Sequence, residues 1–251
     1  MDAEWAIFAP FLTEQSARGG RPPKDHRRTL DGIFWITRSG APWRDLPEEL
    51  GKWNSVHRQF RRWTTSGIWD VLLQALADSG GEADMLQMID STIIRAHHCA
   101  AGGRGDPKSG SGRSRGGFST KLHLRANADG LPISVVLTPG EAHDLIAYDD
   151  LMAERDSDPG VLLGDRGYDS DRLRQDARDR GPQPEIPTKR SRKVQHSVNR
   201  RLYALRSRIE CFINRLKNCR VATRYDHTAS SFLGFALLGC IRLWIRFVHA
   251  A

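Results

Sequence analysis

The spacing of apolar residues changes near residue 84, and this change constrains the fold more than any other feature of the chain. Before it, apolar residues recur every three or four positions, as in Trp5, Phe8 and Leu12, which is the period of a helix with one buried face. After it, short apolar runs and strict alternation dominate, which are typical of strands. The 251 residues are 39% apolar, which excludes a wholly disordered or collagen-like chain. We expect a small all-helical N-terminal domain over 1–80 and an α/β domain over 84–251.

The predicted helical domain divides into three or four short helices at breaks rich in Gly and Pro. Its segment from Trp53 to Trp63 interleaves Arg58, Arg61 and Arg62 with an apolar stripe. One interpretation is the recognition helix of a helix-turn-helix module, which lies in the major groove of DNA. The other is a surface helix with a polar outer face. The pattern is compatible with both.

The α/β domain is expected to form a mixed sheet with flanking helices. Its predicted strands are 85–90, 118–126, 131–138, 161–165 and 184–189. Its predicted helices are 145–155, 170–180 and 198–218. Asp144 is expected to be the N-cap of the first of these helices. The second and third strands flank an Ala-Asp-Gly turn and predict a hairpin.

Charge is divided unevenly along the chain. Residues 81–185 carry 13 basic and 18 acidic side chains, whereas residues 186–251 carry 14 basic and two acidic ones. One interpretation is that the basic C-terminal part binds a polyanion while carboxylates of the acidic part act on it. The other is that the basic residues only form a solvated surface, which has the same composition. Residues 102–117 are rich in Gly and Ser and carry four basic side chains. They predict a flexible basic loop that becomes ordered on nucleic acid.

Residues 232–248 form a long apolar stretch that Arg242 and Arg246 interrupt. Its length is at the lower limit of roughly 17–25 residues for a membrane span, so we expect a buried or dimer-interface helix and no membrane. The N-terminus carries two acids before any base, unlike a signal peptide. The four cysteines form no pair with the spacing of a zinc site or a disulfide framework. We therefore expect a cytoplasmic protein.

Three acidic residues are candidates for chemistry. Asp90 ends the first apolar strand segment, Asp165 ends the segment 161–165, and Glu210 is one of only two acids in the last 66 residues. Open α/β folds hold their sites at the carboxyl ends of strands, and two or three carboxylates suffice to bind Mg²⁺. Two such ions stabilise both the nucleophile and the leaving oxygen at phosphorus. The alternatives are turn caps for the aspartates and an i,i+4 ion pair with Arg206 for Glu210.

Several motifs follow one another in a recognisable order. They are IDSTIIRAH (89–97), GRSRGGFSTKLHL (112–124), GEAHD (140–144) and GDRGYDS (164–170). The most specific is a spaced Tyr-Arg-Glu-Lys set, formed by Tyr203, Arg206, Glu210 and Lys217. With these motifs the chain resembles the insertion-sequence transposases of the DDE type, specifically the IS-five-like group. The resemblance covers nearly the whole chain and shows no departure at a catalytic position.

The resemblance implies a ribonuclease H-like fold in which Asp90, Asp165 and Glu210 are catalytic and bind two Mg²⁺ or Mn²⁺ ions. It implies hydrolysis at the transposon ends and attack of the freed 3′-hydroxyl on target DNA, without a covalent enzyme intermediate. The implied partners are double-stranded DNA, as terminal inverted repeats and target, and a second copy of the chain. A homodimer or larger synaptic complex is expected by analogy.

Other residues are expected to contact DNA or to support the three acids. The expected DNA contacts are Tyr203, Arg206, Lys217, Lys189, Arg190, Arg58, Arg61 and Arg62. The first three are expected on one helix beside Glu210, where they meet phosphates and terminal bases. Lys189 and Arg190 belong to a basic run whose phosphate contacts do not depend on sequence. His143 and Asp144 are expected close to the acids without being metal ligands themselves.

Two other functions are compatible with the sequence. One is a ribonuclease H-like nuclease that cleaves DNA without strand transfer, and the other is a catalytically silent DNA-binding regulator. The presence of all three acids and of the intact Tyr-Arg-Glu-Lys spacing favours the transposase.

Overall fold

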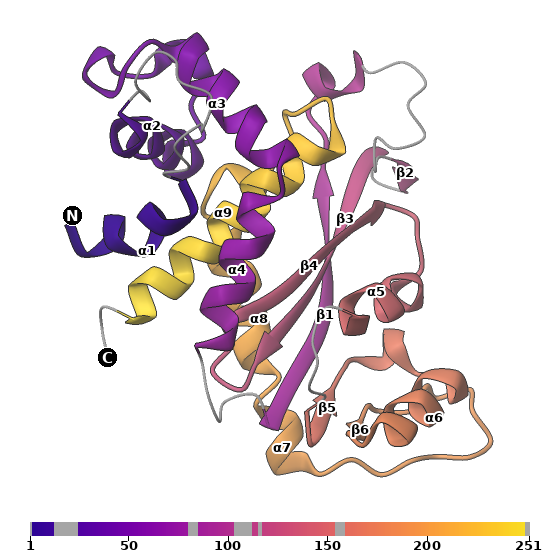
Figure 1. Cartoon of the computed structure of the whole chain (residues 1–251). Coiled ribbons are helices and arrows are strands. Elements are labelled where there is room, and N and C mark those ends of the chain that lie inside the picture. The colour runs from indigo at the N-terminus through magenta and orange to yellow at the C-terminus, as the bar shows by residue number, and fades with distance from the viewer. Residues whose placement is uncertain are drawn as a thin grey trace.

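A mixed β-sheet separates two layers of helices (Figure 1). The computed structural model describes residues 2–12, 25–79, 85–102, 112–114, 117–153 and 159–248. The strands are β1 (Leu86–Arg95), β2 (Gly112–Ser114), β3 (Gly117–Asn127), β4 (Pro132–Pro139), β5 (Val161–Leu163) and β6 (Gln183–Glu185). Five strands follow the order β4-β3-β1-β5-β6, and β2 pairs with the start of β3. Because β3 is antiparallel to β1 and β4 while β5 is parallel to β1 and β6, the predicted mixed sheet and hairpin are confirmed.

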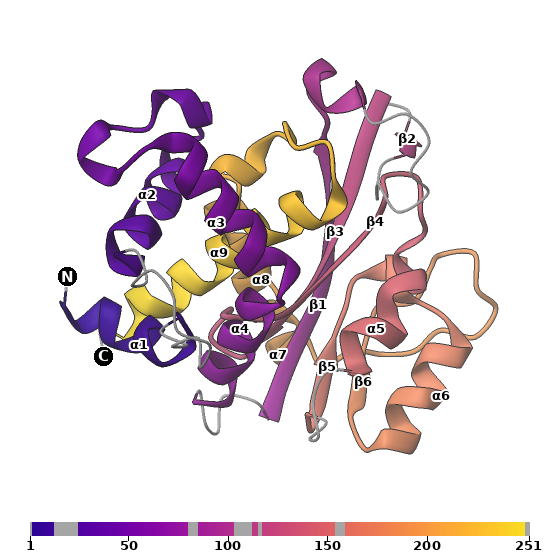
Figure 2. The ribbon, with the colours of Figure 1, turned by 45° about the horizontal axis from the view of Figure 1, so that its top comes forward.

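Alternation along the strands gives each face of the sheet its own apolar cluster. Ile89 and Leu162 face α5 (Tyr148–Ala153) and α6 (Asp171–Arg180), with which they form one buried cluster. Met88, the neighbour of Ile89, belongs to the cluster on the other face. That face is covered by α8 (Ser207–Leu216) and α9 (Ala229–Val248). Figure 2 shows the two helical layers on opposite sides of the sheet.

The predicted N-terminal helices are confirmed in the described residues as α1 (Asp2–Leu12), α2 (His26–Ser39), α3 (Trp53–Thr65) and α4 (Ile68–Asp78). Helix α2 begins at Asp25, whose carboxylate accepts the Arg28 amide at 3.0 Å, and ends at Gly40 in the left-handed conformation. These helices pack on α9, where the rings of Phe60 and Phe235 stack with centroids 4.5 Å apart. The helical region and one face of the sheet therefore share one hydrophobic core. The proposed domain boundary falls at residues 80–84, outside the described residues.

Helix α9 explains the long apolar stretch. By length and composition alone it is apolar enough to cross a membrane, but 61% of its most apolar window is buried inside the protein. Trp244 is fully enclosed, and its indole Nε1 donates to the carbonyl of Pro132 at 2.6 Å. Core helices of soluble proteins have the same composition, and the predicted buried helix is confirmed.

The strands predicted over 161–165 and 184–189 are only three residues long each, as β5 and β6. Three further predicted elements differ in extent by more than one residue. Strand β1 continues five residues beyond Asp90 because β3 pairs with it as far as Arg95, so Asp90 lies in the middle of the strand. The predicted helix 145–155 is a 3₁₀ turn (Asp144–Ala147) followed by α5. Its N-cap is His143 rather than Asp144, whose carboxylate has other partners.

The third difference is the predicted helix 198–218, which is interrupted. It forms α7 (Arg200–Ala204) and α8, joined by Leu205 and Arg206. The amides of residues 205, 206, 208 and 209 bond to carbonyls three residues back instead of four, which tightens the backbone there. Most of the predicted loop 102–117 lies outside the described residues, apart from Gly102, β2 and Gly117.

A buried histidine in β3 predicts acid sensitivity. The Nε2 atom of His123 lies 2.7 Å from Thr138 Oγ1, and burial lowers the pKa of His123 to about 4. Because protonation favours the unfolded chain, this contribution to stability is complete above pH 6.5 and is lost as the pH falls towards 4. We expect the free energy of unfolding to fall by about 3 kcal/mol over this range from His123 alone. Urea unfolding at several pH values checks this: His123→Gln should flatten the decline, and a parallel decline in both proteins contradicts it.

Candidate active site

The register of β1 and β5 places Asp90 and Asp165 next to each other. The last parallel pair is Met88 with Leu163, so each aspartate lies two residues beyond the same rung of the sheet. Asp90 is 8% exposed and its Oδ1 accepts the Ser91 amide at 2.8 Å. Asp165 follows β5, and its Oδ1 accepts the Gly167 amide at 2.8 Å. The carboxylate of Asp165 therefore lies beside the buried carboxylate of Asp90 at the carboxyl end of β5.

Arg206 brings Glu210 to these aspartates. Helix α8 packs against β1, and Arg206 immediately precedes it. The Arg206 Nη2 atom donates to Asp90 Oδ2 at 2.9 Å, and Nη1 donates to Glu210 Oε1 at 2.5 Å. Arg206 Nε is buried with no hydrogen-bond partner among the described residues. One guanidinium therefore joins two acids that are far apart in the sequence.

The charge of this cluster is unbalanced. Burial raises the pKa of Asp90 to about 6, and the negative charges of Asp165 and Glu210 add to the rise, while Arg206 and the Ser91 amide oppose it. Tyr168 lies in the same region with a buried hydroxyl that has no partner among the described residues. Burial raises the pKa of Tyr168 well above its ordinary value, and the charges of Asp144, Asp90 and Asp165 raise it further. The site thus holds more negative charge than Arg206 neutralises.

A second group of side chains supports the aspartates. Asp144 Oδ1 accepts from Ser91 Oγ at 2.6 Å and from Lys121 Nζ at 3.1 Å. Burial alone would raise the pKa of Asp144, but the bonds from Ser91 and Lys121 lower it below its ordinary value. The other carboxylate oxygen of Asp144 faces Gly167, as does Asp165. Asp144 therefore ties the residue after Asp90 to the turn that holds Asp165.

Comparison with known proteins decides the family. Residues 83–244 match the family described as "Transposase DDE domain", and residues 1–73 match "Putative transposase of IS4/5 family". The chain belongs to the DDE transposase family. Its three clustered carboxylates lie within the residues that match the first description.

Relatives and a solved structure agree with this assignment. The transposase is 44% identical to an uncharacterized protein, y4sN, of Sinorhizobium fredii over 105 residues, which is 41% of this chain and 81% of the relative. It is 35% identical over 131 residues to "Putative transposase for insertion sequence element IS6501" of Brucella ovis, which is 51% of this chain and all of the relative. A piggyBac transposase synaptic complex with hairpin DNA has a TM-score of 0.56 at 11% identity, covering 97% of this chain and 70% of that one. This likeness confirms the ribonuclease H-like fold.

Gly167 is the tightest point of the site in this transposase. A Cβ atom there would lie 2.7 Å from Asp144 Oδ2 and 2.9 Å from Asp165 Oδ1. Gly167→Ala must therefore displace a carboxylate, and we expect about a 10²-fold loss of DNA nicking from this misplacement. Nicking assays with Gly160→Ala as control check this, because a Cβ at Gly160 meets its nearest atoms at 3.3 Å. Equal activity of the two variants contradicts the proposed tight packing.

The remaining predicted residues are spread over the transposase. Tyr203 is half-buried on α7, three residues before Arg206. Lys217 is half-buried directly after α8. His143 is exposed, and its Nδ1 accepts the Leu145 amide at 3.3 Å, so it caps a turn while its neighbour Asp144 reaches the site.

Two further groups of predicted DNA contacts lie away from the acids. Arg58, Arg61 and Arg62 are exposed on α3. Lys189 is half-buried and Arg190 exposed, in the segment that follows β6. Figure 1 shows α3 and β6 at opposite ends of the molecule. The structure therefore brings together the three acids, Arg206 and Asp144, but not these two groups.

Sequence reasoning missed four residues of the site. Ser91, Lys121, Gly167 and Tyr168 all lie inside motifs that the sequence displays, but no spacing rule indicates their roles. Lys121 carried the clearest signal, because it and Arg125 are the two charged residues of the strand segment 118–126.

Proposed function

We propose that Asp90, Asp165 and Glu210 form the catalytic, metal-binding site with which this transposase cuts DNA at the ends of an insertion sequence. The freed 3′-hydroxyl would then be joined to target DNA. The observation that carries the proposal is the convergence of three carboxylates from β1, the end of β5 and α8 on one place. Burial raises the pKa of Asp90, and the nearby charges of Asp165 and Glu210 raise it further, as expected for acids that share one site.

The donor set suits hard divalent cations. Mg²⁺ and Mn²⁺ prefer carboxylate and water oxygens, and these three side chains provide only carboxylates. Burial is the main cause of the raised pKa of Asp90, and the negative charges of Asp165 and Glu210 add to it. Asp90, Asp165 and Glu210 would hold two such ions. When bound, the ions polarise the phosphate and activate the attacking oxygen.

The chain's own residues position the DNA and the acids. The Arg206 guanidinium lies between Asp90 and Glu210, bonds to both carboxylates and so offsets their mutual repulsion. Hydrogen bonds from Ser91 on β1 and Lys121 on β3 hold Asp144 in place beside the site. Tyr203, Lys217, Lys189 and Arg190, with the arginines of α3, would contact the phosphates and terminal bases of double-stranded DNA.

Joining two transposon ends requires both to be held at once. We infer a homodimer or larger synaptic assembly on the terminal inverted repeats, acting at the nucleoid in the cytoplasm. Sedimentation of the protein with and without end DNA tests the assembly, since a monomer under both conditions contradicts it.

The deciding experiment incubates purified protein with labelled end DNA in Mg²⁺ or EDTA, and then a pre-cleaved end with target plasmid. We expect nicking at the element boundary only with Mg²⁺, and joining of the 3′-end to the plasmid. Nicking without joining would favour the nuclease. Binding without nicking would favour the silent regulator.

A further inference from the structure

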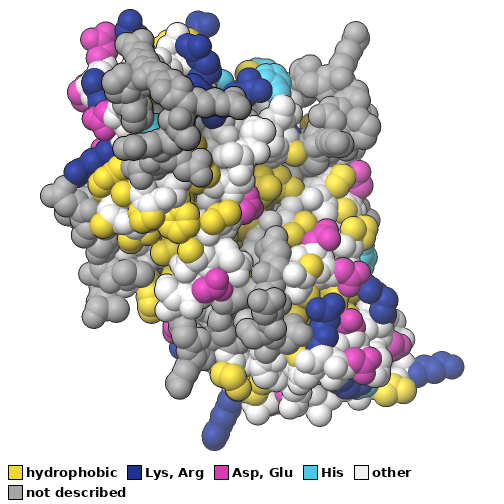
Figure 3. All heavy atoms as spheres, in the orientation of Figure 1, with side chains coloured by type: hydrophobic (Ala, Val, Ile, Leu, Met, Phe, Trp, Pro, Cys, Tyr) yellow, Lys and Arg dark blue, Asp and Glu magenta, His cyan; other side chains and the backbone are white. Residues whose placement is uncertain are grey.

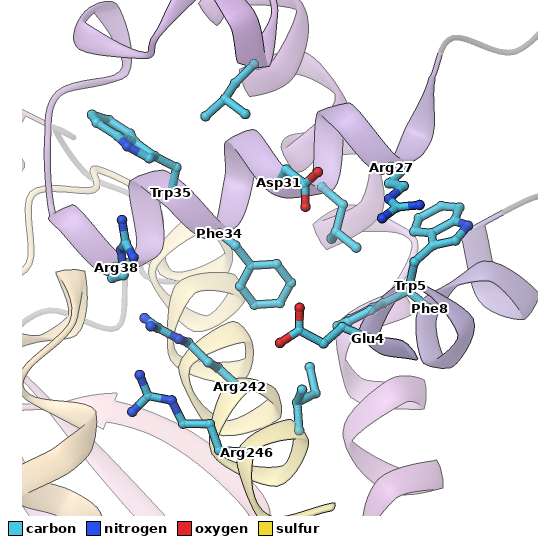
Figure 4. A pocket seen from close by; sticks show the side chains of 13 residues that line it. Glu4, Trp5, Phe8, Arg27, Asp31, Phe34, Trp35, Arg38, Arg242 and Arg246 are labelled. Carbon is cyan, nitrogen blue, oxygen red and sulfur yellow. The ribbon is translucent and has the colours of Figure 1, made fainter. Parts of the chain in front are cut away.

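A cavity of about 420 Å³ lies between α1, α2 and α9, on the helical side of the molecule (Figure 4). One side of it is formed by three arginines from two helices, Arg38 on α2 with Arg242 and Arg246 on α9. Phe34 lies between this side and the opposite one, which holds Glu4 and Asp31. None of these residues belongs to the site of the three acids.

The three arginines form no ion pair with an acid among the described residues. Across the described ranges, no ion pair involves Arg38, Arg242 or Arg246, and the bond from Arg242 goes to the Cys219 side chain. Burial lowers the pKa of Arg242, and the positive charges of Arg246 and Arg38 lower it further. Three guanidinium groups held together without an acid repel one another. An anion placed among them would remove that repulsion.

The arrangement differs from the surface arginines of α6. Arg172 and Arg180 each have an acidic partner, Asp149 and Asp176 respectively. Figure 3 shows acidic and basic side chains intermixed on that side of the protein. Pairing of this kind leaves little net attraction for a polyanion. The cluster on α2 and α9 is therefore distinct from ordinary solvated charge.

We propose that Arg38, Arg242 and Arg246 bind backbone phosphates of duplex DNA, which makes the α2–α9 face a DNA contact surface separate from the acids and from α3. This inference rests on the proposed function, because DNA is then the polyanion that the protein must hold. Guanidinium forks match phosphate oxygens in geometry. Glu4 and Asp31 confine the phosphates to the arginine side of the cavity.

The test compares binding of a 30-base-pair duplex to the wild type and to Arg38→Gln/Arg246→Gln over a range of salt concentrations. Both side chains are exposed, so their loss leaves the core intact. We expect about a tenfold loss of affinity or more at low salt and a salt slope lower by roughly two, about 0.9 for each phosphate contact. The matched control is Arg172→Gln/Arg180→Gln, which removes the same charge from paired arginines and should keep the slope. An unchanged slope in the Arg38/Arg246 variant overturns the proposal, whereas the wild type's own nicking still tests the proposed function.

Two further measurements distinguish binding of DNA phosphates from binding of a free anion. Asp31→Asn should raise the affinity for DNA, opposite in sign to the arginine variants, because it removes a like charge facing the phosphates. Inorganic phosphate should compete only weakly with the duplex. If phosphate raises the Tm of the wild type but not of the variant while DNA binding is equal in both, the site takes a free anion and the proposal is wrong. The proposal is also wrong if Arg38→Gln/Arg246→Gln alters only the self-association of the protein, as measured by sedimentation, and leaves DNA binding unchanged.

Discussion

Glu210→Gln and Asp90→Asn are each expected to reduce metal-dependent nicking at transposon ends on the order of 10³-fold or more. Losses of this size are typical when a group that stabilises charge in the transition state is removed. Each substitution removes one carboxylate from the set that would hold the metal ions while keeping the side-chain shape. The measurement is the single-turnover nicking rate in Mg²⁺ on labelled end DNA. Asp149→Asn serves as control, because Asp149 is exposed and pairs only with Arg172 among the described residues.

The same two variants are expected to differ in stability. Burial raises the pKa of Asp90 to about 6 from an ordinary value of 3.8, so its neutral form favours folding below pH 3.8 and this contribution is lost as the pH rises through 6. At pH 8 Asp90→Asn should therefore raise the free energy of unfolding by about 3 kcal/mol. Glu210 has a side chain that is 53% exposed, and its replacement should change little.

Denaturant unfolding without metal checks this pair. An inactive but stabilised Asp90→Asn protein would show that activity is maintained at the expense of stability. A destabilised Asp90→Asn protein would mean that Arg206 more than compensates the buried charge. Wild-type nicking by Glu210→Gln would remove Glu210 from the catalytic set altogether.

Local pattern was sufficient for most of the fold. The period of apolar residues identified the N-terminal helices, the hairpin of β3 and β4, β5 and α6, because each buries one face against the core. It did not show that β1 continues past Asp90, since the continuation depends on pairing with β3. Nor did it show that the N-terminal helices share a core with α9, because that depends on contacts such as Phe60 with Phe235.

The candidate site was predictable to a similar degree. Asp90, Asp165 and Glu210 stood out by position and by the family motifs, but no pattern places one guanidinium between two of them. The helix is interrupted at Arg206 although no Gly or Pro in the neighbouring sequence predicts an interruption. Asp144 looked like a helix cap, and only the folded chain brings Ser91 and Lys121 to its carboxylate. Long-range contacts, rather than local propensity, determine these roles.

Arg206→Gln is expected to destabilise the metal-free protein by about 3 kcal/mol at pH 8, because it leaves the buried Asp90 carboxylate without its partner. The side chains of Arg206 and Asp90 are only 16% and 12% exposed, so solvent screens this pair weakly. The ion pair with Glu210 should add little, since that carboxylate is mostly in water.

A double-mutant cycle distinguishes this explanation from a packing defect. If the loss comes from the unpaired charge of Asp90, then Arg206→Gln/Asp90→Asn should be more stable than the sum of the two single effects by a coupling energy of about 2 kcal/mol. Mg²⁺ should also stabilise Arg206→Gln more than it stabilises Asp90→Asn, because only the former retains all three carboxylates. Strictly additive effects and equal responses to Mg²⁺ would show that Arg206 stabilises the backbone tightening between α7 and α8 instead. The guanidinium would then have no part in balancing the charge of the site.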